Sequence, residues 1–152
     1  MNPEWYGQQY PTLDNLMDFG ESLGAYTQFS KHIHTAVYIP ETKTFSLILI
    51  PNQHGALATI WALAHEIGHL CQHGGPKGKL FWGKDEAQAN RWAACALIPR
   101  TRIEYYNNAS KDAFIASLSA HYEELPLHDC PARNLAHRIA SIRLETLAVK
   151  QE

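Results

Sequence analysis

The sequence predicts an α+β fold for a single domain of 152 residues. Apolar residues recur at helical spacing in residues 12–23 and again in the second half of the chain, whereas three short runs between residues 25 and 50 favour strands. A chain of this length can bury a substantial hydrophobic core within one domain. We therefore expect one domain over residues 1–152, with a core region at about 12–99 and a helical part at about 100–152.

The N-terminal region is expected to contain an arm followed by one helix. Residues 1–11 are polar and aromatic, with two prolines, and favour a loop. In residues 12–23, apolar side chains recur at the spacing of one helical face. Thr12 can cap the start of this helix, and Gly24 can end it in the left-handed conformation.

A short three-stranded sheet is expected next. Residues 25–30 favour a strand only weakly, whereas residues 35–39 and 45–50 are rich in β-branched, aromatic and other apolar side chains. The residues between the last two runs, 40–44, predict the turn of a β-hairpin. Residues 51–55 then lead out of the sheet and into the next helix.

That helix carries the motif His65-Glu66-Ile67-Gly68-His69, which matches the pattern H-E-x-x-H. Residues four apart lie on the same face of a helix, roughly 6 Å from each other, so both imidazoles can reach one metal ion. Glu66 lies between them in sequence and can act as general base toward water activated by that ion. The motif therefore indicates a mononuclear zinc site built for hydrolysis, usually of peptide bonds.

Gly68 is unusual within this motif helix. Glycine inside a helix costs ~1 kcal/mol relative to alanine, so its presence indicates that another segment passes close by. The alternative to a metal site is an ordinary buried helix whose two histidines form hydrogen bonds in the core. That alternative does not explain a second motif downstream.

A third metal ligand is expected from the helix predicted at residues 84–94, because a catalytic zinc usually has three protein ligands. Glu86 lies near its first turn, and Asn90 falls one turn later on the same face, where its amide can orient a ligating histidine. Asp85 is the rival ligand, but it lacks the four-residue relation to Asn90. Taken alone, Glu86 is better explained as a solvated surface charge.

The last part of the chain is expected to be helical. Pro99 is expected to stop the helix that carries Glu86. Residues 110–122 predict a further helix with Ser110 as its N-cap, and residues of about 132–149 predict another. We expect these C-terminal helices to pack against the core region.

Two segments and a short ending carry a more specific signal: Ala64-His65-Glu66-Ile67-Gly68-His69, Glu86-Ala87-Gln88-Ala89-Asn90-Arg91-Trp92-Ala93-Ala94 and Leu97-Ile98-Pro99. In this combination the chain resembles the ImmA/IrrE family of metallopeptidases, whose pattern is A-H-E-L-G-H followed by E-x-x-A-N-x-F-A-A-x-L-L-M-P. Trp92 stands where phenylalanine is usual, and Ile98 where methionine is usual. Both replacements are apolar.

The resemblance implies that His65, His69 and Glu86 bind one zinc ion per chain, that Glu66 is catalytic and that Asn90 supports a ligand. It also implies a small zincin-like domain, with residues of about 12–99 as the zinc core. Two histidines and a carboxylate suit zinc, but they also accept manganese or iron. Members of the family typically cleave a helix-turn-helix transcriptional repressor. The chain has no recognisable DNA-binding domain, so a separate repressor is the implied partner.

A longer zinc-peptidase pattern, in which a third histidine follows on the same segment, does not fit this chain. Gly75 occupies the position of that histidine, and His73 comes two residues early. We interpret His73 as the C-terminal residue of the motif helix, where a positive charge suits the helix dipole. A role of His73 in substrate binding is the alternative.

The negatively charged oxygen that forms during peptide hydrolysis needs a donor in addition to the metal. The candidates are Tyr105, Tyr106, His121 and Arg102, which all follow the Glu86 helix. No spacing singles out one of them. The two tyrosines are equally well explained as packing residues.

Composition narrows the environment of the protein. The 13 basic and 15 acidic residues nearly balance and form no basic stripe, so no direct contact with nucleic acid is expected. No apolar run approaches the ~20 residues that span a bilayer, and no signal peptide is evident. The widely spaced Cys71, Cys95 and Cys130 suit reduced thiols. We expect a cytoplasmic protein without a membrane partner.

Two other classes of function compete with the peptidase. The chain could be a catalytically inactive metal-binding module that regulates or binds a partner. The presence of Glu66 argues against this class, because metal binding alone does not require that residue. The chain could also hydrolyse substrates other than proteins, since the shape of the cleft decides which substrate reaches the metal.

Overall fold

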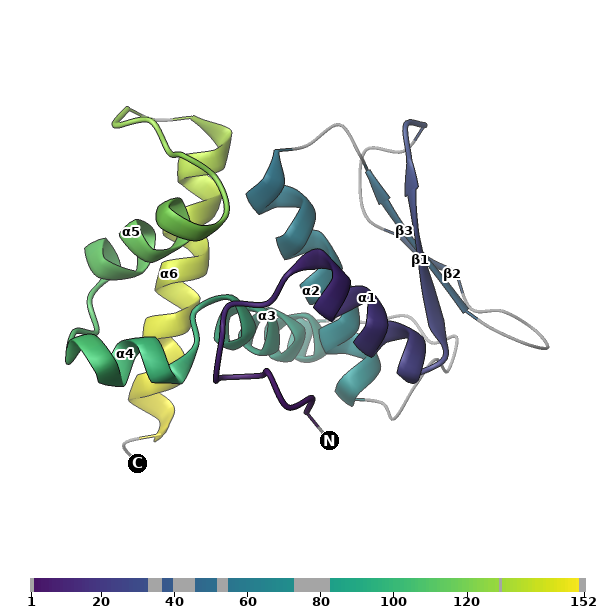
Figure 1. Ribbon diagram of the computed structural model, residues 1–152, viewed down its shortest axis with the longest axis horizontal. Coiled ribbons are helices and arrows are strands. Elements are labelled where there is room, and N and C mark those ends of the chain that lie inside the picture. The colour runs from purple at the N-terminus through teal and green to yellow at the C-terminus, as the bar shows by residue number, and fades with distance from the viewer. Residues whose placement is uncertain are drawn as a thin grey trace.

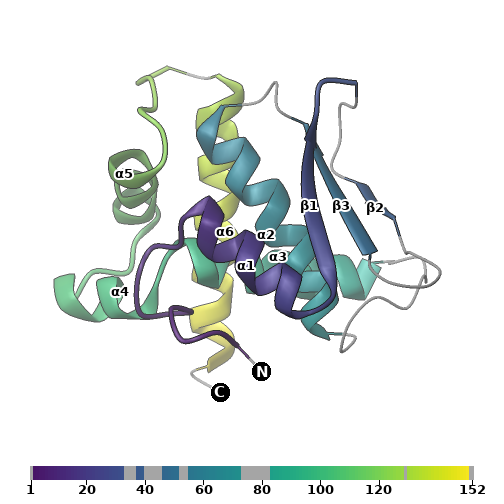
Figure 2. The same cartoon turned by 45° about the vertical axis from the view of Figure 1, so that its right-hand side comes forward.

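The computed structural model of the chain has an α+β fold (Figure 1). It describes residues 2–32, 37–39, 46–51, 55–72, 83–128 and 130–150. The elements in chain order are α1 (Leu13–Ser22), β1 (Ala25–Ser30), β2 (Val37–Ile39), β3 (Ser46–Pro51), α2 (Ala56–Gln72), α3 (Gly83–Leu97), α4 (Arg100–Tyr106), α5 (Lys111–His121) and α6 (Pro131–Lys150). The sheet lies at one side, α4, α5 and α6 lie at the other, and α1, α2 and α3 lie between them (Figures 1 and 2).

The first helix, α1, begins and ends as the sequence predicts. The Thr12 hydroxyl accepts a hydrogen bond from the Asn15 N–H, and the Asn15 side-chain oxygen accepts one from the Thr12 N–H, both at 3.0 Å. This reciprocal capping box satisfies two backbone donors at the helix start. Gly24 follows the helix with a φ of +92°, a conformation that favours glycine.

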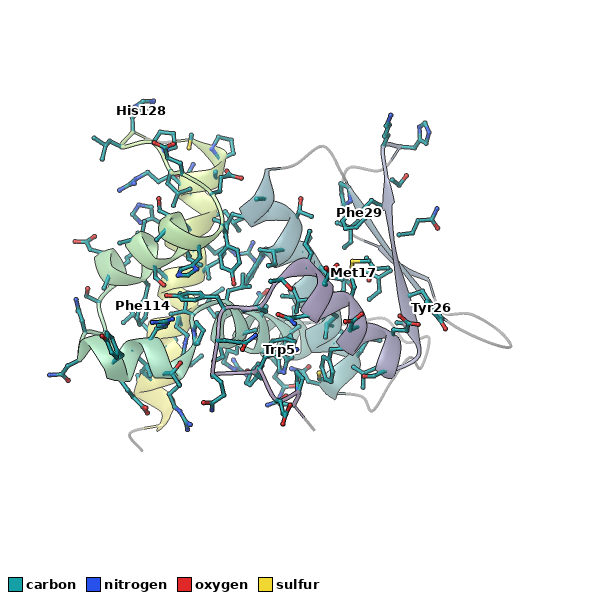
Figure 3. All side chains as sticks on the ribbon, in the orientation of Figure 1. Trp5, Met17, Tyr26, Phe29, Phe114 and His128 are labelled. Carbon is teal, nitrogen blue, oxygen red and sulfur yellow. The ribbon has the colours of Figure 1, made fainter. Side chains whose placement is uncertain are left out.

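The sheet has the strand order β1-β3-β2. Strand β1 pairs with β3 in parallel, with Ala25 opposite Ser46, and β2 pairs with β3 antiparallel. The antiparallel pair is the arrangement that the predicted hairpin requires, and its turn at 40–44 lies outside the described residues. Ile48 and Ile50 of the central strand are fully buried, because alternate side chains point to the same face. Figure 3 shows Met17 and Phe29 in the space between the helices and the sheet.

Helix α2 is the central element of the core. It contacts α1, α3, α6 and β3, so most of its surface is covered by other elements. A helix that is apolar on most sides is stable only when it is buried in this way. Its fully buried side chains include Leu57, Leu63 and Ile67. The motif residues therefore lie on a helix that is held from several sides.

The N-terminal arm packs on α3 through an aromatic cluster that consists of Trp5, Tyr6, Phe19 and Trp92. The ring centres of Tyr6 and Trp92 are 5.0 Å apart, and the Tyr6 hydroxyl donates to the Trp92 carbonyl at 3.3 Å. The Trp92 indole N–H in turn donates to the Asn2 side chain at 2.9 Å. Figure 3 shows Trp5 close to α1 and α3. The expected loop is therefore an arm that covers part of α3.

The two predicted C-terminal helices are present as α5 and α6, and Ser110 caps α5 by accepting a hydrogen bond from the Ala113 N–H. The expectation that Pro99 only stops a helix was incomplete. Pro99 is also the N-cap of α4, with φ −65° and ψ 144°. Proline is tolerated at this position, because an N-cap has extended backbone angles and its N–H would have no partner within α4.

Arg143 links α6 to the junction between α3 and α4 by a hydrogen bond. Its side chain is 1% exposed, and its Nε donates to the Ile98 carbonyl at 2.8 Å. One terminal nitrogen also donates to the Thr146 hydroxyl at 2.7 Å. These bonds satisfy donors of a guanidinium that could not otherwise be buried. The C-terminal helix is thereby tied to the end of the helix that carries Glu86.

The length and the apolar character of the helices decide whether any of them could span a membrane. A helix that spans a membrane needs about 20 mostly apolar residues. Over the described ranges, no helix is both long enough and apolar enough to do so.

Candidate metal centre

The predicted metal-binding side chains meet where α2 and α3 pack against each other. His65 and His69 lie one turn apart on α2, and Glu86 lies in the first turn of α3. Their ligand atoms all lie within 4.8 Å of one another. Two segments that are separate in the sequence therefore bring two imidazoles and one carboxylate together.

The three side chains form a closed triangle of short contacts. The Nε2 atoms of His65 and His69 are 3.2 Å apart. One carboxylate oxygen of Glu86 lies 2.8 Å from His69 Nε2, and the other lies 3.1 Å from His65 Nε2. His69 is 2% exposed, whereas the Glu86 side chain is 47% exposed. The group is therefore anchored in the core and open to solvent beside Glu86.

These distances fit a bound metal ion. Zinc binds histidine nitrogen and carboxylate oxygen at about 2.0–2.2 Å with tetrahedral geometry, which places neighbouring ligand atoms about 3.3 Å apart. The observed separations of 2.8, 3.1 and 3.2 Å are close to that value. Two imidazole nitrogens and a carboxylate are also donors that zinc, manganese and iron accept. The residues present therefore fit an ion held by three protein ligands.

Asn90 lies directly behind one of the imidazoles. Its side-chain oxygen is 2.7 Å from the Nδ1 atom of His65. An amide oxygen only accepts hydrogen bonds, so Nδ1 carries the proton and donates it. The lone pair of His65 then lies on Nε2, the atom that faces His69 and Glu86. Asn90 thus holds His65 in the tautomer that a metal ion requires.

Glu66 is partly buried beside the same group. Burial, and then the negative charge of Glu86, together raise the pKa of its carboxyl from the ordinary 4.5 to about 7. A carboxyl with a pKa near neutral can accept and release a proton at neutral pH. The arrangement therefore combines a triangle of side chains that fits a metal ion with a group suited to proton transfer.

A sequence model of peptidase family M78, described as the IrrE N-terminal-like domain, matches residues 11–125. The match covers most of the chain and includes His65, Glu66, His69 and Glu86. The chain belongs to this family. Comparisons with curated proteins and with solved structures gave no significant match. Membership indicates a metal-dependent peptidase, and the group of His65, His69 and Glu86 is a candidate site for its metal.

Gly68 explains how α2 and α3 of this IrrE-like protein come close enough to bring His65, His69 and Glu86 together. A Cβ atom at this position would lie 2.8 Å from the Ala89 carbonyl oxygen and 3.0 Å from the Ala89 Cα. Both are backbone atoms of α3, which cannot move aside as a flexible side chain can. The close approach that the glycine predicted is therefore present, and the approaching segment is the helix that carries Glu86 and Asn90.

Replacing Gly68 with alanine is expected to push α3 away from α2. We expect the free energy of unfolding to fall by about 1–3 kcal/mol, as for other overpacked core positions, although alanine favours helices. Metal affinity should fall as well, because Glu86 moves with α3. Gly20→Ala is the matched control, since a Cβ on this helical glycine of α1 would lie no closer than 3.4 Å to another atom. Equal effects of the two substitutions would contradict the close-packing explanation.

The raised pKa of Glu66 predicts how the stability of the metal-free protein depends on pH. The folded state holds the Glu66 proton more tightly than the unfolded state, because the pKa is about 7 in the former and 4.5 in the latter. The resulting stabilisation is complete below the unfolded value and is lost as the pH rises through the folded value. Its full size is on the order of 3 kcal/mol.

The measurement is denaturant unfolding in a chelator at several pH values, for the native protein and for Glu66→Gln. The difference between the two curves reports the ionisation of Glu66, including its interaction with Glu86. We expect the native protein to lose stability relative to the variant between about pH 5 and pH 8. A difference that does not change with pH would show that the carboxyl is not desolvated.

The other predicted site residues have different surroundings. His121 stacks on Tyr10, with ring centres 3.5 Å apart, and Tyr105 is 75% exposed. The side chains of Tyr106 and of the rival ligand Asp85 lie outside what the structure describes, and so does His73. The choice of an oxyanion donor therefore stays a prediction.

One contact at the start of α2 was not predicted from the sequence. A carboxylate oxygen of Glu123 accepts a hydrogen bond from the Leu57 N–H at 3.3 Å, across 66 positions in the sequence. A negative charge at a helix N-terminus is favourable, because the first N–H groups have no partner within the helix. Gly55 leaves room for this side chain, since a Cβ there would lie 2.0 Å from the Glu123 oxygen. The residues after α5 thus cap the helix that carries the motif.

Proposed function

We propose that this IrrE-like protein is a zinc-dependent endopeptidase that uses Glu66 as its general base. The observation that carries the proposal is the triangle of His65, His69 and Glu86 with Glu66 partly buried beside it. Membership of peptidase family M78 supports the same reaction class. Retention of Glu66 argues against a module that only binds metal, because the three ligands are sufficient for binding.

His65, His69 and Glu86 would hold the metal ion, one per chain. When bound, zinc supplies Lewis-acid chemistry, which lowers the pKa of water and stabilises negative charge on oxygen. Manganese could occupy the same donors. Asn90 contributes by keeping the proton of His65 on Nδ1, so that Nε2 remains available as a ligand.

Glu66 would move one proton during the reaction. Its carboxylate takes the proton from the water that attacks the scissile carbonyl carbon. When the carbon–nitrogen bond breaks, the same proton goes to the leaving amine, which leaves a carboxylic acid and a free amine as products. A group that must both accept and release a proton works best with a pKa near the operating pH, and burial moves Glu66 toward that range.

The architecture that we propose is a single zincin-like domain, with a zinc core at about 12–99 and a helical part at about 100–152. In the described sheet, β1 and β2 are the outer strands, so each has an edge that does not pair with β3. An extended peptide can bind along such an edge through main-chain hydrogen bonds. We propose that the substrate binds in this way above the metal centre.

For the substrate, we propose a separate helix-turn-helix transcriptional repressor. The support is the resemblance to the ImmA/IrrE family rather than any contact within the chain. Because repressors act where the DNA is, we also propose a cytoplasmic location. We propose no direct contact of this chain with nucleic acid and none with a membrane.

Incubation of the zinc-loaded protein with helix-turn-helix regulators from the same organism is expected to give defined fragments of at least one of them. Mass spectrometry of the fragments identifies the cleaved bond. Glu66→Gln, loaded with the same metal, is the control and should give no fragments. If the regulators stay intact while a denatured protein is cleaved, the substrate is not one of these repressors, but the peptidase activity is supported. If nothing is cleaved, the inactive metal-binding module becomes the better explanation.

A further inference from the structure

A pocket of about 440 Å³ lies between the N-terminal arm, α4 and α5. None of the residues that line it is among the metal-binding group, Glu66 or Asn90, although Arg102 and His121 are two of the candidate oxyanion donors. Figure 3 shows Phe114 where α4 and α5 approach each other. Much of the wall is apolar and consists of Ile98, Ile103, Ala113, Phe114, Ala116 and Ala120. The volume is within the range of about 300–1,000 Å³ that is usual for small-molecule sites.

Polar groups line one part of this pocket, and they hold one another in place. The guanidinium carbon of Arg102 lies 5.5 Å from the centre of the Tyr10 ring. The His121 ring stacks on the same ring, with centres 3.5 Å apart. The Tyr10 hydroxyl forms a hydrogen bond with the Ser117 hydroxyl. The arm, α4 and α5 thus each contribute to one ordered polar cluster.

The charge of the cluster is that of a single cation. Arg102 is protonated at any physiological pH. Among the residues that line the pocket there is no carboxylate, and no ion pair joins Arg102 to a carboxylate elsewhere in the described parts of the chain. Burial, and then the nearby Arg102 guanidinium, lowers the pKa of His121, which favours the neutral imidazole. The pocket therefore presents one positive charge next to an apolar wall.

We propose that this pocket binds a small carboxylate with an apolar body, such as a medium-chain or aromatic acid. Arg102 would pair with the carboxylate, which matches the geometry of a guanidinium, and the hydroxyls of Tyr10 and Ser117 provide further polar contacts. The apolar body would lie against Ile98, Ile103 and Phe114. A single guanidinium suits one negative charge better than the several charges of a nucleotide. The proposal does not depend on peptidase activity.

The test is a calorimetric titration of the zinc-loaded protein, residues 1–152, with octanoate and, separately, with its uncharged analogue octanol. We expect saturable binding of octanoate, and binding of octanol that is at least about tenfold weaker, because octanol cannot form the charged pair. Arg102→Gln should weaken octanoate binding by about tenfold or more while leaving the binding of octanol nearly unchanged. Ala116→Phe, at an exposed helix position that lines the pocket, should abolish the binding of both compounds.

Arg100→Gln is the matched control. Arg100 lies on the same helix, is exposed, pairs with Glu104 and does not line the pocket, so its replacement should change nothing. Octanoate is also a ligand for zinc, and binding at the metal centre would be insensitive to both Arg102→Gln and Ala116→Phe. That result, or no saturable binding of octanoate to the native protein, would overturn the proposal. Circular dichroism of each variant shows whether a loss of binding reflects a loss of fold.

Discussion

Replacing Glu66 with glutamine is expected to lower the rate of peptide cleavage by roughly 10²- to 10⁴-fold, the usual contribution of a general base. Glutamine has nearly the same shape but cannot take a proton from water. Metal binding should be unchanged, because His65, His69 and Glu86 make the close contacts and Glu66 does not. The measurement is the rate of cleavage of a protein substrate, with the metal content of each sample determined in parallel.

Glu104→Gln is the matched control for this experiment. Glu104 is an exposed carboxylate on α4 that pairs only with Arg100 among the described ion pairs. Its replacement also turns a glutamate into a glutamine and should leave cleavage at the native rate. Full activity of Glu66→Gln would rule out the assigned base, whereas loss of metal from that variant would give Glu66 a structural role instead.

Removing one ligand is expected to remove the metal. In His69→Ala and Glu86→Ala, elemental analysis should find far less than the one zinc per chain that is expected for the native protein, since a catalytic zinc needs three protein ligands. Asn90→Ala should have a smaller effect, about 10- to 100-fold in metal affinity, because Asn90 only orients His65. This graded order is the signature of two ligands and one supporting residue.

The two ligand variants differ in what else they disturb. His69 is 2% exposed, so its replacement also leaves a cavity in the core, whereas the Glu86 side chain is 47% exposed and its replacement does not. Glu86→Ala is therefore the cleaner test, with Glu104→Ala as the control on an exposed carboxylate. Zinc retained in Glu86→Ala would mean that the third ligand is a different residue, with Asp85 as the first alternative.

Local patterns predicted which side chains lie together between α2 and α3, because these residues come in pairs one helical turn apart. The spacing of His65 and His69 on one helix, and of Glu86 and Asn90 on another, fixes which side chains share a face. Gly68 indicated that another segment passes close by, and the structure shows that this segment is α3. These four side chains do lie together in the structure. The close contact between α2 and α3 that brings them together is the one that Gly68 allows.

The same reasoning predicted the ends of several elements. Thr12 and Ser110 cap α1 and α5 as expected, since a cap depends on residues only three positions away. Helix α4 was missed because Pro99 was interpreted only as the end of one helix and not as the start of the next. A proline between two helices fits both interpretations, and seven residues are too few for a clear periodic pattern.

Contacts between distant parts of the chain could not be predicted. The cap that Glu123 places on α2 joins residues 66 positions apart, and no local pattern relates them. The pocket around Arg102 is formed by the arm, α4 and α5, so its existence depends on how three elements pack. The surroundings of His121 are set in the same way, which is why its chemistry could not be assigned from its place in the sequence.

The most direct test of the central claim is a crystal structure of the zinc-loaded protein, with anomalous diffraction recorded on both sides of the zinc absorption edge. We expect one anomalous peak per chain, about 2.0–2.2 Å from the Nε2 atoms of His65 and His69 and from the carboxylate of Glu86. A peak elsewhere in the chain, or no peak in a protein that has been loaded with zinc, would contradict the assignment of the metal site and the zinc-dependent peptidase mechanism that depends on it.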